Sequence, residues 1–109
     1  METVTHGQVL ARFGHALSDA TRARLLLALR ESPGYPAELA GLLGVTRQNM
    51  SNHLACLRGC GLVVAVPEGR RTRYELAGPQ IRQALDSLLG LVLAVDPGAC
   101  PDAAIKGCC

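Results

Sequence analysis

The chain has 109 residues, a length that predicts one domain with a modest core and much exposed surface. Hydrophobic residues make up 49% of it and aromatic residues only 3%, so the core must be built from Leu, Val and Ala, which favours packed helices over a β-sandwich. The formal net charge of +2 is too small to indicate a nucleic-acid partner by itself, and no stretch reaches the roughly 18 apolar residues of a membrane span.

Two amphipathic helices are predicted in the first third of the chain. Apolar residues at helical spacing indicate a helix over 7–17, and Ser18 or Asp19 is positioned to cap a second helix over 20–30. The segment 32–36 contains two prolines and a glycine, and it should end the second helix.

The next segment has the pattern of a helix-turn-helix. Pro36 suits the first turn of a short helix, predicted over 37–43, and Gly44 suits its C-terminal cap. Thr46 is then placed to cap a longer helix over 47–60. A short helix, a turn containing glycine and a longer helix together predict a DNA-binding unit whose second helix is the recognition helix.

The last third predicts a hairpin, a final helix and a tail. The β-prone runs 62–66 and 72–76 surround a turn at 67–71 and predict a hairpin with a basic tip. A last helix should begin at Gly78-Pro79 and continue to about residue 95, before a flexible, cysteine-containing tail over 96–109. The apolar stripe of this last helix comprises Ile81, Leu85, Leu88, Val92 and Val95. We therefore predict a mainly α fold with a small hairpin, one domain over 1–95, and a homodimer formed through the first and last helices.

The recognition helix has a predicted core face and a predicted DNA face. Each residue advances about 100°, so Met50, Leu54 and Leu57 point together into the core. About 120° away, Gln48 and Ser51 form a short polar face suited to base edges and phosphates. The candidate DNA-binding residues here are Thr46, Arg47, Gln48, Ser51 and Asn52. An ordinary solvated face is the alternative, but the preceding turn and the following basic hairpin favour DNA binding.

The hairpin adds three basic candidates, Arg70, Arg71 and Arg73. These arginines would either keep an edge strand soluble or reach phosphates and the minor groove as a wing beside the recognition helix. The second interpretation fits the adjacent helix-turn-helix better.

The five cysteines suggest a second chemistry. The first residues do not resemble a secretory signal, so we expect a cytoplasmic protein with no membrane partner, where metal ligands or redox thiols are better explanations than disulfides. Cys56 and Cys60, one helical turn apart, should occupy a third face that touches neither core nor DNA and could hold one soft ion. A third ligand is needed, and Cys100 in the tail is the leading candidate. Cys108 and Cys109 are possible accessory ligands or a pair without a role.

Five segments together resemble the ArsR/SmtB family: 17–24, 38–42, 45–54, 61–63 and 68–70. The likeness extends over about residues 8 to 95. It implies a dimeric winged-helix repressor that binds operator DNA and releases it when a metal or another inducer binds.

The cysteine pattern is similar to one branch of that family, the cadmium and lead sensors. This likeness lies in residues 54–65 and 93–96, and it implies that Cys56, Cys60 and Cys100 bind Cd(II) or Pb(II). In that branch the tail cysteine comes from the other subunit, although the residues themselves leave open whether Cys100 acts within its own subunit or across the dimer. His53, one turn before Cys56, is a weaker candidate ligand.

Several rival interpretations use the same thiols. Arsenite, As(III), also accepts three thiolates, and Zn(II) or a redox input would suit a repressor of the same design. A metal-sequestering protein would have the cysteines without binding an operator. An enzyme is not expected, because no redox Cys-x-x-Cys, catalytic carboxylate pair or serine nucleophile motif is present.

Overall fold

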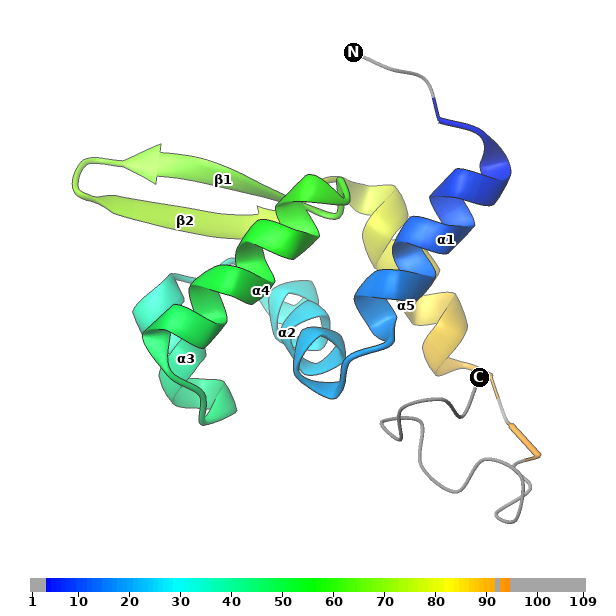
Figure 1. Ribbon diagram of the computed structural model, residues 1–109, viewed down its shortest axis with the longest axis horizontal. Helices are drawn as coiled ribbons and strands as arrows, with labels where there is room; N and C mark the ends of the chain where they lie inside the picture. The colour runs from blue at the N-terminus through cyan, green and yellow to red at the C-terminus, as the bar shows by residue number, and fades with distance from the viewer. Residues whose placement is uncertain (1–3, 92, 95–109) are drawn as a thin grey trace.

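The computed structural model describes residues 4–91 and 93–94, and it confirms a mainly α fold with one small hairpin. Five helices and one two-stranded antiparallel sheet make up this part of the chain (Figure 1). In chain order these elements are α1 (His6–Leu17), α2 (Ala20–Glu31), α3 (Pro36–Leu43), α4 (Arg47–Gly59), β1 (Val63–Glu68), β2 (Arg71–Leu76) and α5 (Pro79–Leu89).

The first four helices begin and end close to the predicted residues because local side chains satisfy their ends. Asp19 accepts a hydrogen bond from the Arg22 backbone N–H at the start of α2 (3.0 Å), and Thr46 accepts one from the Asn49 N–H at the start of α4 (3.0 Å). Gly44 ends α3 in the left-handed conformation with φ 70°, which a residue without a side chain adopts at no steric cost.

A leucine-rich core joins α2, α3, α4 and the base of the hairpin. Leu25 and Leu26 from α2 and Met50 and Leu57 from α4 are completely buried, and Val63 extends the core to β1. The predicted core face of α4 is therefore confirmed. Burial of this face fixes how α4 is turned on the core. Only the other faces of α4 are then open to ligands.

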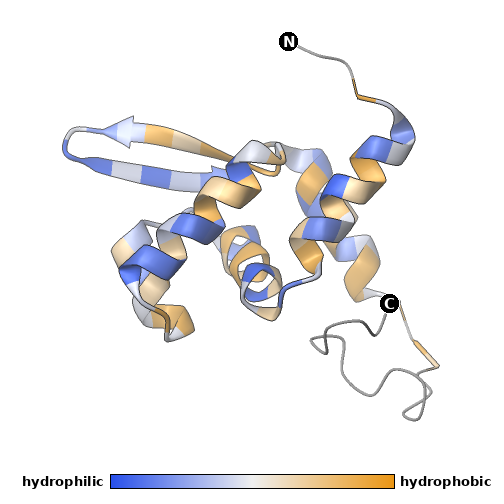
Figure 2. Ribbon diagram, in the orientation of Figure 1, coloured by the Kyte–Doolittle hydropathy of each residue, from blue (hydrophilic) through white to orange (hydrophobic). Residues whose placement is uncertain are grey.

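The hairpin projects from the helical body on the side away from α1 and α5 (Figure 1). Its strands pair from Val63 opposite Leu76 to Glu68 opposite Arg71. Gly69, with φ 61°, is the first of the two turn residues, the position that a type II′ turn reserves for glycine. Figure 2 shows that β1 is hydrophobic where it meets the helices and that β2 is mainly hydrophilic.

The last helix is shorter than predicted. α5 ends at Leu89, where the N–H of Gly90 bonds to the Asp86 and Ser87 carbonyls (3.2 Å each). The prediction of a helix to residue 95 was wrong. It followed the apolar residues past position 90, but Leu91 and Leu93 are not helical. Val92, Val95 and the predicted tail over 96–109 lie outside the described residues.

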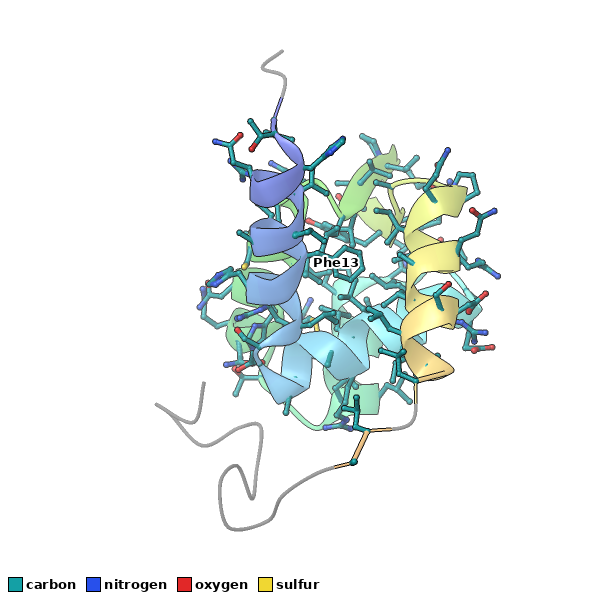
Figure 3. The ribbon with its side chains drawn as sticks, turned by 90° about the vertical axis from the view of Figure 1, so that its right-hand side faces the viewer. Phe13 is labelled. Atoms are coloured by element: carbon teal, nitrogen blue, oxygen red, sulfur yellow. The ribbon has the colours of Figure 1, made fainter. Side chains whose placement is uncertain are left out.

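An apolar face runs between α1 and α5. Figure 3 looks onto this face, with α1 and α5 on either side and the Phe13 side chain pointing from α1 into the space between them. A hollow of about 550 Å³ lies there, lined by α1 and α5 side chains that include Leu10, Phe13 and Leu88. Leu10 is 73% exposed and Leu88 is 42% exposed, so this face presents several apolar side chains to water together. None of the described helices combines the length and the apolar character that a membrane span requires.

Candidate DNA-binding and thiol sites

The polar face of α4 is open to solvent, as a recognition helix requires. Burial of Met50, Leu54 and Leu57 leaves Gln48, Ser51 and Asn52 exposed. The Gln48 side chain donates a hydrogen bond from Nε2 to Oδ1 of Asn52 (3.1 Å). This bond holds two amide side chains side by side near the start of the helix, where they can present donors and acceptors to base edges.

The N-terminal end of α4 brings the remaining helix candidates to the same surface. Thr46 and Arg47 are both exposed. The Thr46 hydroxyl serves as the N-cap, and the positive dipole end of α4 lies at this exposed end of the helix. All five predicted helix residues are therefore exposed at or near the start of α4.

The three hairpin arginines differ in their surroundings. Arg70 is exposed at the turn. Arg71 places its guanidinium 3.5 Å from the centre of the Tyr35 ring, and Arg73 forms ion pairs with Glu68 and Glu75. The sequence prediction treated these three arginines as equivalent. Arg71 and Arg73 each have hydrogen-bond and ion-pair partners among the described residues, whereas Arg70 has none there.

Cys56 and Cys60 are both free, half-buried thiols at the C-terminal end of α4. Burial raises the pKa of the Cys60 thiol, and the charge of the Cys56 thiol and a hydrogen bond with it act in the same direction. The positive charges of Arg12 and Arg22 oppose this rise in the pKa of Cys60. The two sulfur atoms are thus neighbours, as a shared soft ion would need.

One part of the thiol prediction was wrong. Cys60 does not lie away from the core but packs against its edge, because the end of α4 approaches α1. A hollow of about 320 Å³ lies between these two helices, lined by Cys60, Gln8, Ala11, Arg12 and His15. Cys60 therefore lies on the α1 side of the molecule rather than on a free helix face.

The third predicted ligand, Cys100, lies outside the described residues, as do Cys108 and Cys109. Within residues 4–91 and 93–94, no group of three or more His, Cys, Asp or Glu side chains could hold a metal ion. The donor set of two neighbouring thiols fits a soft ion, and it needs completion by a residue from elsewhere. His53 faces Asp19 instead, with 3.9 Å between Nε2 and Oδ2.

Sequence reasoning missed the residues that hold the hairpin to α3. Tyr35 donates a hydrogen bond to Glu68 (2.5 Å), and Glu38 accepts one from Arg71 (3.4 Å). Each pair is separated by 33 residues, so no local pattern could have indicated it. The tyrosine preceding Pro36 was the one available hint, because an aromatic residue in an exposed breaker segment often has a packing partner.

Comparison with known proteins is consistent with this geometry. The sequence model of a protein family, described as "Bacterial regulatory protein, arsR family", matches residues 19–64 of this chain. These residues run from the N-cap of α2 into β1. The HTH-type transcriptional regulator CmtR of Mycobacterium tuberculosis is 59% identical over 87 residues, which cover 80% of this chain and 74% of that protein.

Two solved structures extend the comparison. The NMR structure of the cadmium metal-sensor CMTR from Mycobacterium tuberculosis matches with a TM-score of 0.64 and 58% identity, covering 79% of this chain and 90% of that one. The homodimeric winged helix-turn-helix domain of Mb0332 from Mycobacterium bovis matches with a TM-score of 0.72 and 26% identity, covering 82% and 87%. The relatives are regulators of transcription, which confirms that the chain is not of an enzymatic class.

Proposed function

Because this chain belongs to the arsR family of bacterial regulatory proteins, we propose that it is a metal-responsive transcriptional repressor. The metal-free homodimer binds operator DNA and releases it when Cd(II) or Pb(II) occupies a site formed by Cys56, Cys60 and Cys100. One observation carries this proposal: the two neighbouring thiols lie at the end of α4, the helix whose exposed polar face we assign to DNA reading.

DNA binding is supported by the exposed residues at the start of α4 and by the hairpin beside it. A homodimer would place two such helices about 34 Å apart, one turn of DNA, on a palindromic operator. The exposed apolar face between α1 and α5 supports dimerisation because a monomer would leave that surface in water. The Mb0332 relative is itself homodimeric.

Metal binding is supported by the chemistry of the donors. Thiolates prefer soft ions, and Cys56 and Cys60 are close enough to interact. Cys100 supplies the third thiolate in this proposal. The similarity to a cadmium sensor favours Cd(II) over Zn(II) and As(III) as the inducer.

The position of Cys60 indicates how an occupied site would influence DNA binding. Its side chain packs against the edge of the core and lines the hollow between the end of α4 and α1, so drawing a tail cysteine toward it would alter the contacts that orient α4. A coupling free energy of about 1 to 3 kcal/mol would weaken the operator complex roughly 5- to 150-fold. The ion must bind the DNA-free conformation more tightly for this to occur.

The test is operator release measured by fluorescence anisotropy. The probe is a labelled duplex that the metal-free protein selects from a random-sequence pool. We expect Cd(II) to weaken binding by the wild type, and to have no effect on Cys56→Ser, Cys60→Ser or Cys100→Ser, whereas Cys108→Ser serves as the matched control and responds like the wild type. Full Cd(II) response by Cys56→Ser would contradict the proposed site.

A second titration identifies the inducer. The same wild-type complex is titrated with Cd(II), Pb(II), Zn(II) and arsenite under reducing conditions. Release by Cd(II) or Pb(II) at the lowest concentrations supports the proposal, and release by arsenite alone would make the chain an arsenite-responsive repressor. Thiol-dependent metal binding without selection of any duplex would instead indicate a metal-sequestering protein.

A further inference from the structure

The three arginines of the hairpin are not equally available to DNA. Arg70 is exposed at the turn, and among the described residues it has neither a hydrogen bond nor an ion pair. Its guanidinium therefore gives up only water when it approaches a phosphate. Such a contact releases a counterion from the DNA and makes binding steeply dependent on salt.

Arg73 is already neutralised by the protein. It contacts Glu68 through Nη1, and its Nε lies 3.5 Å from Oε2 of Glu75. Its side chain is only 32% exposed, and its Nε is buried. If Arg73 turned to a phosphate, Glu68 and Glu75 would both lose their ion pair with it, so the exchange gains little.

Glu68 connects Arg73 to the helix-turn-helix. Its Oε1 accepts a hydrogen bond from the Tyr35 hydroxyl (2.5 Å), and its Oε2 accepts one from Nη1 of Arg73. Tyr35 immediately precedes α3, and Arg71 stacks on its ring. The hydrogen bond from Tyr35 raises the pKa of its phenol, because the bond and the nearby negative charge of Glu68 favour the protonated form.

The backbone fixes the same junction. Gly34 exchanges two hydrogen bonds with Tyr74 of β2, at 3.0 and 2.8 Å. A Cβ atom at Gly34 would lie 2.9 Å from the Leu39 side chain, so the segment approaches the core as closely as glycine allows. The hairpin is thus joined to α3 by backbone and side-chain contacts together.

We propose that Tyr35, Glu68 and Arg73 are positioning residues that mount the hairpin on α3, and that Arg70 is the residue of the hairpin that contacts phosphate. This inference rests on the proposed DNA-binding function. It gives two of the predicted wing arginines different roles, an electrostatic one for Arg70 and a structural one for Arg73.

The first experiment is the salt dependence of binding to the selected duplex. Arg70→Gln should reduce the slope of log K against log salt by about 0.9 for each hairpin that contacts DNA. Arg73→Gln should weaken binding and leave that slope at the wild-type value. Arg82→Gln, which removes an exposed arginine from α5, is the matched control for net charge. An equal loss of slope in the Arg70 and Arg73 variants would overturn the assignment.

A double-mutant cycle tests positioning without changing charge. Tyr35→Phe keeps the ring under Arg71 and removes only the hydroxyl that binds Glu68. If the contacts of Tyr35, Glu68 and Arg73 orient the hairpin and with it Arg70, the Arg70→Gln change should cost less affinity in the Tyr35→Phe background than in the wild type. Strictly additive losses would overturn the positioning role. This cycle also decides the question if Arg73→Gln does not fold.

A third measurement needs no DNA. Titration of the tyrosine absorbance, assigned with Tyr35→Phe, should show that Glu68→Gln lowers the pKa of Tyr35. An unchanged pKa of Tyr35 would mean that the hydrogen bond between Tyr35 and Glu68 is not formed in solution. Failure of the wild type to select any duplex would instead overturn the proposed function. This titration would still show whether Tyr35 and Glu68 are in contact.

Discussion

Asp19 serves two helices with one carboxylate. Its Oδ2 accepts the Arg22 N–H at the start of α2 and lies 3.9 Å from Nε2 of His53 on α4. The Arg22 backbone hydrogen bond is the main reason that the pKa of Asp19 is lowered, with burial acting against it and the charges of His53 and Arg22 adding to it. The ionised form is therefore favoured by folding.

This arrangement predicts a pH-dependent stability contribution. A lowered pKa in the folded state means that the contribution is complete above the ordinary value of 3.8 and is lost as the pH falls through the folded value. Asp19→Ala should lower the free energy of unfolding by about 1 kcal/mol at neutral pH, through loss of the cap. The difference from the wild type should shrink in acid.

Urea unfolding followed by circular dichroism, at one fixed protein concentration, measures both effects. Asp19→Asn is the control, because it keeps a capping oxygen and removes the charge. It should retain most of the wild-type stability at neutral pH. An Asp19→Ala variant as stable as the wild type would show that the cap contributes nothing.

At the scale of elements, α3 shows how adjacent residues can have opposite roles. Leu43 is 7% exposed and belongs to the core, whereas Leu42 is 68% exposed on the same helix. Leu43→Ala should lower the free energy of unfolding by about 2 to 5 kcal/mol, through lost burial and the cavity left behind. Leu42→Ala should change it by less than about 0.5 kcal/mol. Similar losses in the two variants, measured by urea unfolding, would mean that α3 packs differently.

The sequence predicted those elements whose ends depend on neighbouring residues. Thr46 and Gly44 act within a few residues of their own positions, so α3 and α4 could be placed closely from the pattern alone. The end of α5 could not, because the apolar residues Leu91 and Leu93 continue past the turn at Gly90. Apolar composition indicates burial in some interface, and it does not by itself extend a helix.

The candidate sites divide in the same way. The exposed polar face of α4 follows from helical periodicity, which is a local property. The packing of Cys60 against α1 and the contact of Tyr35 with Glu68 depend on the tertiary fold, which brings together residues far apart in the chain. Periodicity alone therefore predicted which residues face outward, but not which exposed charges are already paired.

At the scale of the whole molecule, the two proposed interfaces lie on opposite sides. The hairpin extends from one side, and the apolar face of α1 and α5 occupies the other (Figure 1). Cys60 lies between them, where the end of α4 approaches α1. In the proposed repressor, a change of the contacts at Cys60 would therefore alter the angle between the proposed dimerisation face and α4.

The apolar face predicts the oligomeric state. Leu10 on α1 and Leu88 on α5 both border the hollow between these helices, and they are 73% and 42% exposed in the single chain. Covering them with a second copy removes apolar area from water, at about 25 cal/mol for each Å². Leu10→Glu would place a charge on that surface, and pairing the variant with a second copy would bury it.

Sedimentation equilibrium should find a wild-type dimer and a Leu10→Glu monomer at the same micromolar concentration. Leu42→Glu introduces the same charge at a similarly exposed leucine on α3, and it should remain dimeric. The Leu10→Glu monomer should also lose operator affinity, because a single recognition helix cannot engage both halves of a palindrome. A Leu10→Glu dimer with wild-type affinity would place the subunit interface elsewhere, and Cys60 would then no longer lie between the two interfaces.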